Sequence, residues 1–114
     1  MHEMSIAQSI VDIVEKEIAN FGAEQPKAVN IAVGKLAAVV PEQLAFCFSI
    51  ITLETSLAGV TLNIREVPLS YTCFACGEEF TSGEMAIVCP KCDDTHIDLT
   101  SGRELTVESI EVAD

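Results

Sequence analysis

Four of the five cysteines stand in two close pairs, and this spacing constrains the fold more than any other feature of the chain. Cys73 and Cys76 are separated by two residues, as are Cys89 and Cys92, and twelve residues lie between the pairs. Each short interval suits a turn-like knuckle with both sulfurs pointing inward, and twelve residues are a hairpin's length. Four thiolates can therefore converge on one tetrahedral metal ion, and the pattern predicts a closed structural zinc site.

Other interpretations of the four cysteines are weaker. Two disulfides suit a secreted chain, whereas the opening Met1-His2-Glu3 lacks the basic and apolar regions of a signal peptide, which favours a reduced, cytoplasmic setting. A redox Cys-x-x-Cys site needs only one pair. A rubredoxin-like iron centre that carries single electrons stays open as an alternative, although few aromatic residues lie nearby: Tyr71, Phe74 and Phe80.

The cysteine pairs lie in a segment that differs from the rest of the chain. Residues 69–98 hold clusters of turn residues and only short apolar runs, so they cannot form another layer of a shared core. We expect a zinc-binding domain at 69–98, inserted into a domain made of residues 1–68 and 99–114. Without a metal, so few apolar side chains could not offset the conformational entropy of the segment.

Two helices are predicted outside this segment. Apolar residues three and four apart predict an amphipathic helix over 6–21 that stops at Gly22, and Pro41 opens a second helix that Gly59 can cap. The expected buried face of the first helix comprises Ile6, Ile10, Ile13, Val14, Ile18 and Phe21.

Three strands are predicted by alternating apolar residues, over 28–34, 60–65 and 104–112. A change of phase in the last strand predicts a bulge around Glu108–Ser109. The order of elements implies an α+β fold in which two helices pack on one face of a small three-stranded sheet, with the zinc-ribbon-like cysteine domain inserted before the last strand.

Charge and length exclude several classes of protein. The chain has 114 residues, 18 of them acidic and only six Lys or Arg, for a net charge of -12. Nucleic-acid binding depends on a basic face, and residues 69–98 contain Lys91 as their one basic residue. The longest apolar stretch, Leu44–Ile51, is far shorter than a membrane span of about 20 residues. We therefore expect a small protein that binds neither nucleic acid nor membrane.

The amino terminus offers a second set of metal donors. The terminal amine of Met1, the peptide nitrogens of His2 and Glu3 and the His2 ring can all reach one ion, and such a near-planar nitrogen set favours nickel(II) or copper(II) over zinc. By itself this pattern is weak, because a histidine near the start of a chain is more often simply solvated. His96, four residues after the last cysteine, is interpreted in the same way.

Three stretches together resemble the hydrogenase nickel-incorporation family HypA/HybF. They are Met1-His2-Glu3-Met4-Ser5-Ile6, the cysteine segment with Cys89-Pro90-Lys91-Cys92, and Gly102-Arg103-Glu104-Leu105 leading into Ile110-Glu111-Val112. The resemblance spans the whole chain. It implies two helices on a mixed three-stranded sheet, an inserted zinc domain, and a nickel metallochaperone, which is not an enzyme, for maturation of nickel-iron hydrogenase. The implied partners are a nickel-handling GTPase and the hydrogenase large subunit, and some family members also serve urease.

Carried onto this sequence, the resemblance makes His2 the nickel ligand, with the Glu3 backbone nitrogen as a further donor. The Met1 terminal amine joins them on the chelate argument above. It assigns zinc to the four cysteines. Nickel is then cargo, held loosely enough to be surrendered, and zinc is scaffold. Because an unperturbed histidine has a pKa near 6.5, we expect nickel affinity to fall below about pH 6. A monomer and a weak homodimer both fit the sequence.

Two points stay open in this interpretation. A Gly commonly follows the last cysteine in the family, and here Asp93-Asp94 stands there, so the second knuckle must place an Asp in a left-handed conformation. A zinc-ribbon protein-interaction adaptor also remains an alternative function, besides the rubredoxin-like electron carrier. Such an adaptor would tolerate a tag on Met1, whereas nickel binding would not.

Overall fold

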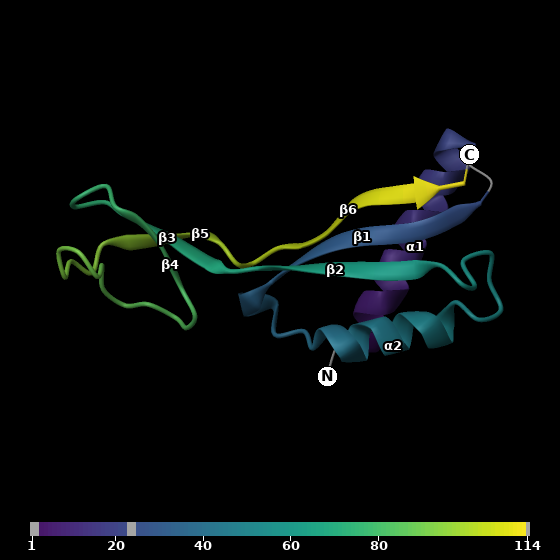
Figure 1. Cartoon of the computed structure of the whole chain (residues 1–114), viewed down its shortest axis with the longest axis horizontal. Helices are drawn as coiled ribbons and strands as arrows, with labels where there is room; N and C mark the ends of the chain where they lie inside the picture. Colours follow the sequence, from purple (N-terminus) through teal and green to yellow (C-terminus); the bar gives the residue numbers. More distant parts are fainter. Residues whose placement is uncertain (1–2, 23–24, 114) are drawn as a thin grey trace. The chain divides into compact units, whose positions relative to one another are not determined.

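A computed structural model of the chain describes residues 3–22 and 25–113 (Figure 1). The chain divides into two compact units. The first contains the residues up to Ala32, then Val39–Arg65, then those from Thr106 onwards, and the second contains Val33–Ala38 and Glu66–Leu105. Within the described ranges, no helix combines the length and the apolar character required to span a bilayer.

The first unit combines two helices with a three-stranded sheet, as expected. Helix α1 covers Glu3–Phe21 and helix α2 covers Pro41–Ile51. The sheet has the order β2-β1-β6, formed by Pro26–Gly34 (β1), Thr61–Val67 (β2) and Leu105–Val112 (β6). Strands β1 and β2 are joined through α2 (Figure 1). The central strand β1 therefore pairs with the next strand of the first unit, β2, and with β6 from much later in the chain. This arrangement confirms the α+β class.

Helix α1 buries a different face from the expected one. Ala7 and Val11 are buried beside Ile10 and Val14, while Ile13 and Phe21 are exposed. Helix α1 packs against α2, and the stripe that it buries runs through Ala7, Ile10, Val11 and Val14.

The ends of the helices show where local signals hold and where they fail. Gly22, with φ 67°, ends α1 as predicted. Helix α2 begins at Pro41 but ends at Ile51, whereas the sequence suggested that it continues toward Gly59. The Thr52 hydroxyl donates to the Phe48 carbonyl at 2.7 Å, and the residues that follow form turns. Hydroxyl side chains compete with the helix for backbone partners in this way.

The polar side chains of the sheet form a hydrogen-bonded layer. Asn30 donates to the Ser109 hydroxyl at 3.0 Å and to the Glu111 carboxylate at 2.9 Å, and the Arg65 guanidinium holds Glu108 in a two-bond ion pair. The adjacent residues Glu108 and Ser109 therefore both point to this polar side, which is the irregularity that the change of phase in β6 predicts.

The second unit contains three strands that the sequence analysis did not identify. They are β3 (Leu69–Cys73), β4 (Glu79–Ser82) and β5 (Ile97–Ser101), and β3 pairs antiparallel with both neighbours. Tyr71 on the central strand lies opposite Phe80 on one side and Leu99 on the other, with a register shift between Ser70 and Tyr71. The cysteine segment is thus a small sheet rather than a set of loops.

The second unit also contains the early segment Val33–Ala38, which hydrogen-bonds to residues that follow β5. The Gly34 N–H donates to the Glu104 carbonyl at 2.6 Å, and the Leu36 N–H, in the short 3-10 turn Lys35–Ala37 (η1), donates to the Gly102 carbonyl at 2.7 Å. A Cβ at Gly34 would collide with the Gly102 backbone, so only glycine permits this approach. The second unit therefore includes 33–38, 66–68 and 99–105 in addition to the 69–98 segment.

Candidate metal centre

The two Cys-x-x-Cys turns have the same backbone hydrogen bonds. The Cys73 N–H donates to the Glu78 carbonyl and the Gly77 N–H donates to the Cys73 carbonyl, both at 2.9 Å. In the second turn the Cys89 N–H donates to the Asp94 carbonyl and the Asp93 N–H donates to the Cys89 carbonyl, again at 2.9 Å. The sequence therefore builds one knuckle twice, as the paired spacing predicts.

Asp93 adopts the left-handed conformation that the sequence requires of it. Its φ is 63°, and Gly77 at the corresponding position of the first knuckle has φ 77°. Asp is among the few side chains that tolerate this region of backbone space. The departure from glycine at this position thus leaves the knuckle intact.

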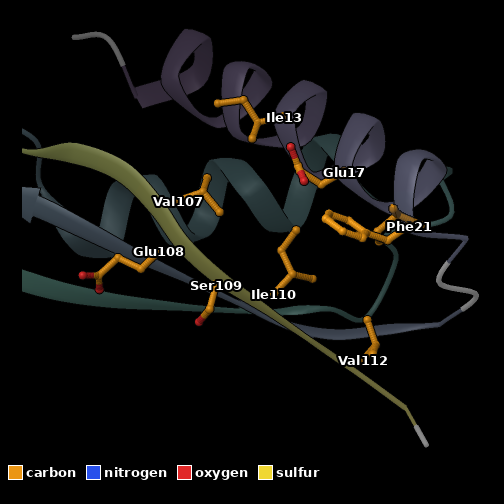
Figure 2. Close-up of a pocket in the computed structure, with 9 residues that line it drawn as sticks. Ile13, Glu17, Phe21, Val107, Glu108, Ser109, Ile110 and Val112 are labelled. Carbon is orange, nitrogen blue, oxygen red and sulfur yellow. The ribbon is translucent and has the colours of Figure 1, made fainter.

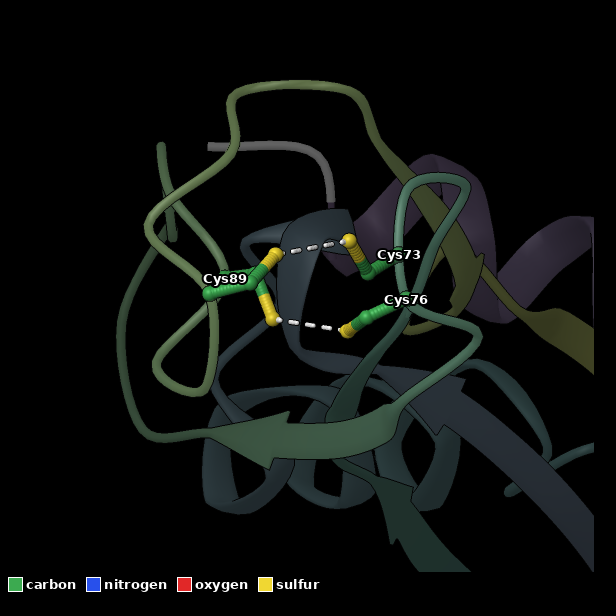
Figure 3. A group of neighbouring side chains, drawn as sticks. Cys73, Cys76 and Cys89 are labelled. Carbon is green, nitrogen blue, oxygen red and sulfur yellow. Dashed lines mark hydrogen bonds between the residues drawn. The ribbon is translucent and has the colours of Figure 1, made fainter.

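The two knuckles bring all four sulfurs together. Cys73 Sγ lies 3.6 Å from Cys92 Sγ, and Cys76 Sγ lies 3.7 Å from Cys89 Sγ. The four sulfurs all lie within 4.8 Å of one another. Figure 3 shows the Cys73 and Cys76 side chains of one knuckle turned toward Cys89 on the other.

The distances fit a tetrahedral metal ion. Metal–sulfur bonds of about 2.3 Å place neighbouring sulfurs of a tetrahedron about 3.8 Å apart, close to the two separations observed. Cys73 and Cys89 are buried and Cys76 and Cys92 are exposed, so the cluster lies at the edge of its unit. Four thiolates complete the coordination of such an ion and leave no open position for a substrate.

Backbone N–H groups surround the sulfurs and favour their charged form. The Cys76 N–H, with the Ala75 N–H, donates to the Cys73 sulfur and lowers the pKa of that thiol to about 7. The Lys91 N–H lies 3.4 Å from the Cys89 sulfur in the second knuckle. For Cys92, the Asp94 N–H acts to lower the pKa, but burial and the neighbouring thiols outweigh it and raise the pKa to about 12. Without a metal, four sulfurs this close cannot all be ionised, so a divalent ion would displace protons on binding.

Tyr71 joins the sheet to the loop that precedes the second knuckle. Its ring stacks on Phe80 with ring centres 5.2 Å apart, and its hydroxyl accepts the Ala86 N–H at 3.0 Å.

His96 lies outside the cluster: it is highly exposed, and its Nδ1 is 2.7 Å from an Asp94 carboxylate oxygen. Over residues 3–22 and 25–113, the four cysteines form the one group of His, Cys, Asp and Glu residues able to hold a metal ion.

The amino-terminal donors are described only in part. Met1 and His2 lie outside the described residues. Glu3 is buried, and its carboxylate accepts the Val40 N–H at 3.2 Å. Val40 is the N-cap of α2 and has no capping side chain of its own, so Glu3 fulfils the role that a glutamate usually fulfils within one helix. Sequence reasoning missed this role, because nothing local connects residue 3 to residue 40.

The fold and the sulfur cluster define a small α+β protein built around a tetrahedral four-thiolate metal centre. Comparison with known proteins places it more closely. The chain belongs to the HypA family, since the family model described as hydrogenase/urease nickel incorporation, metallochaperone, HypA matches residues 1–112.

Individual relatives agree with this assignment. The chain is 47% identical over 115 residues to the hydrogenase maturation factor HypA of Desulfatibacillum aliphaticivorans, covering 100% of this chain and 88% of the relative. It is also 47% identical over 114 residues to that of Desulfosudis oleivorans, covering 98% of each. Among solved structures, the Ni metallochaperone HypA from Helicobacter pylori superposes with a TM-score of 0.69 at 23% identity, covering 98% of this chain and 97% of that one. A second HypA solution structure gives 0.74 at 23% identity, covering 99% and 97%. These two structures support the fold.

Proposed function

We propose that this chain is a nickel metallochaperone for the maturation of nickel-iron hydrogenase. The observation that carries the proposal is the match of the HypA family model to residues 1–112. Relatives at 47% identity are named hydrogenase maturation factors. The family description also includes urease, so a urease is a second possible recipient of the metal.

The nickel site in this proposal lies at the amino terminus. His2 supplies a ring nitrogen, the Glu3 peptide supplies a backbone nitrogen, and Met1 supplies the terminal amine. The hydrogen bond from the Val40 N–H to the Glu3 carboxylate supports a backbone role for Glu3, because its side chain is already engaged. A site of this kind binds an ion without enclosing it, which suits delivery by ligand exchange.

The four cysteines hold zinc in the same proposal. Zinc supplies a rigid cross-link between the two knuckles. Four thiolates in a tetrahedron are a usual ligand set for structural zinc. Iron takes the same four-sulfur geometry, and the few aromatic residues around the cluster favour zinc over a rubredoxin-like electron carrier. The closed cluster supports a scaffold role, so we propose a protein with no catalytic activity of its own.

The partners follow from the cargo. We propose that a nickel-handling GTPase and the hydrogenase large subunit receive the ion in the cytoplasm, from a monomer or a weak homodimer. Transfer then needs only that the recipient offers better ligands than the donor set of Met1, His2 and Glu3.

Nickel titration of the untagged, zinc-loaded protein tests the proposal. We expect one Ni(II) per chain, lost in His2→Ala and retained in His96→Ala, with weaker binding below about pH 6 as the histidine gains a proton. A tag on Met1 should also weaken binding, because it removes the terminal amine. If a folded His2→Ala variant kept its nickel affinity, the proposed nickel site would be wrong, and the protein-interaction adaptor would be the favoured function.

Elemental analysis of the same sample separates the metals. We expect one zinc per chain and a colourless protein. A red protein with one iron per chain would instead identify an electron carrier.

A further inference from the structure

A groove in the first unit runs between helix α1 and strand β6 (Figure 2). Its volume is about 410 Å³, within the range of roughly 300–1,000 Å³ usual for binding pockets. Figure 2 shows Ile13 and Phe21 on the helix facing the side of the strand that carries Val107 and Ile110. We call this surface the α1–β6 groove.

The apolar walls of the groove are open to water. Phe21 is 80% exposed, Ile13 46% and Val112 43%. All three lie outside the buried core, to which α1 contributes Ala7, Ile10, Val11 and Val14 instead. A contiguous apolar surface that includes an exposed aromatic side chain is typical of interaction sites.

One carboxylate stands among these apolar residues. Glu17 lines the groove, is only half-exposed, and makes no hydrogen bond or ion pair within the described part of the chain. Glu108 differs because its side chain turns away from α1 and pairs with Arg65 (Figure 2). A carboxylate beside apolar side chains forms its most favourable ion pair with a cation that is itself flanked by apolar groups, because both sides of the contact then exclude water.

The negative charge around the groove favours a basic partner. Helix α1 and strand β6 carry six acidic residues and a single basic one, Lys16. A second copy of this chain, with its net charge of -12, would bring like charges together. Strand β6 is also at the edge of the sheet β2-β1-β6, so its outer backbone groups can pair with an added strand.

We propose that the α1–β6 groove binds an extended segment of a protein partner in which apolar residues alternate with Arg or Lys. The segment pairs with the edge of β6, its apolar side chains cover Phe21 and Ile13, and one of its cations pairs with Glu17. This interaction surface goes beyond the proposed nickel function and involves neither the cysteines nor His2.

Three capped nonapeptides test the proposal against the full, zinc-loaded chain. One alternates Arg with Val, one alternates Arg with Ser, and one alternates Glu with Val. Affinity is measured by calorimetry and the contact surface by amide chemical shifts. We expect saturable binding of the Arg-Val peptide at least tenfold tighter than that of the other two, with shifts concentrated in residues 13–21 and 105–112.

Variants make the test specific. Glu17→Gln and Phe21→Ala should each weaken the affinity for the Arg-Val peptide at least fivefold. The control Glu54→Gln removes an acidic charge elsewhere in the first unit and should change this affinity less than twofold. Amide spectra confirm that each variant is folded. Equal binding of the Arg-Ser peptide, equal effects of Glu17→Gln and Glu54→Gln, or shifts outside the groove would overturn the proposal. So would sedimentation that shows a dimer of the free protein dissociated by Phe21→Ala, because the groove would then belong to a second copy.

Discussion

Gly77 and Asp93 hold equivalent positions in the two knuckles, each four residues after the first cysteine, and both have a left-handed backbone. The equivalence shows that the conformation, rather than the glycine, is what the metal centre requires. At Gly77 a Cβ would have space, since nothing lies within 4 Å of it, so any penalty for a side chain there is a backbone penalty.

The first prediction follows from this equivalence. Gly77→Ala and Asp93→Ala should each destabilise the zinc-loaded protein by about 1 kcal/mol, because alanine adopts a left-handed conformation at a cost of roughly 1–2 kcal/mol. Asp93→Asn should leave stability unchanged, since Asn tolerates the same conformation. Denaturant unfolding with excess zinc measures the three variants, and an Asp93→Ala variant as stable as the parent would contradict the backbone argument.

Metal removal should loosen the second unit selectively. In the proposed site, zinc would join two knuckles whose buried neighbours, Leu69 and Tyr71, form too small a core to stay closed without a metal. We expect a strong chelator, or Cys92→Ser, to increase hydrogen exchange at the amides of β3 and β5 while the α1 amides change little. Cys47→Ser serves as the control, because Cys47 is in α2 and should keep the parent exchange pattern. Unchanged protection of β3 after complete zinc removal would argue against a structural role for the metal.

Two phenylalanines on α2 provide a matched pair for the core of the first unit. Phe48 is 1% exposed and Phe46 is 63% exposed. Phe48→Ala should lower the free energy of unfolding by about 3–5 kcal/mol, the usual cost of emptying a buried aromatic site. Phe46→Ala should change it by no more than about 0.5 kcal/mol. Similar losses in both variants would show that the exposed residue has a partner in solution.

Glu3 should stabilise the start of α2 as well as lie beside His2. Glu3→Ala removes the acceptor of the Val40 N–H and should lower the melting temperature, whereas Glu3→Gln keeps an oxygen acceptor and should lower it less. If the Glu3 peptide is a nickel donor, both variants should still bind nickel, because both retain the backbone nitrogen. Calorimetric melting and nickel titration of the two variants check the two roles separately.

The Arg65–Glu108 pair should give the first unit a pH-dependent stability. Hydrogen bonding and charge attraction from Arg65 hold the pKa of Glu108 below its ordinary value. The pair therefore stabilises the fold above the unfolded pKa of roughly 4.3 and stops doing so as the pH falls through the lower folded pKa. Both side chains are more than a third exposed, so the effect should be small.

Unfolding of Glu108→Gln and the parent protein at pH 7, 5 and 3 measures this dependence. The variant should be less stable at pH 7, and the difference should shrink as the pH falls and the parent carboxylate gains a proton. Arg65→Gln should behave in the same way. A constant difference at all three values would show that the pair contributes through packing rather than charge.

The metal centre was more predictable than the sheets that hold it. Spacing alone identified the four cysteines, because ligand geometry depends on a few residues close in sequence. The left-handed backbone at Asp93 was anticipated from the resemblance to a family in which Gly commonly stands there. Strand β3 was missed, since Leu69, Tyr71 and Cys73 form too short a run for alternation to indicate a strand by itself. The approach of Gly34 to Gly102 involves residues far apart in the chain, which no local pattern reports.

The buried face of α1 was only partly predictable for a related reason. Periodicity fixes the spacing of the apolar residues but not which of them faces the partner helix, and Ala7 does not stand out in an apolar pattern. The outcome is informative about the surface: the apolar residues left outside the core, Ile13 and Phe21, are those that line the α1–β6 groove.

The strand order β2-β1-β6 also dictates an order of events during synthesis. The central strand β1 is made early but receives its second neighbour only when Leu105–Val112 has left the ribosome. By then all four cysteines and the strands β3, β4 and β5 have already emerged. The four cysteines can therefore come together before strand β6 completes the sheet of the first unit.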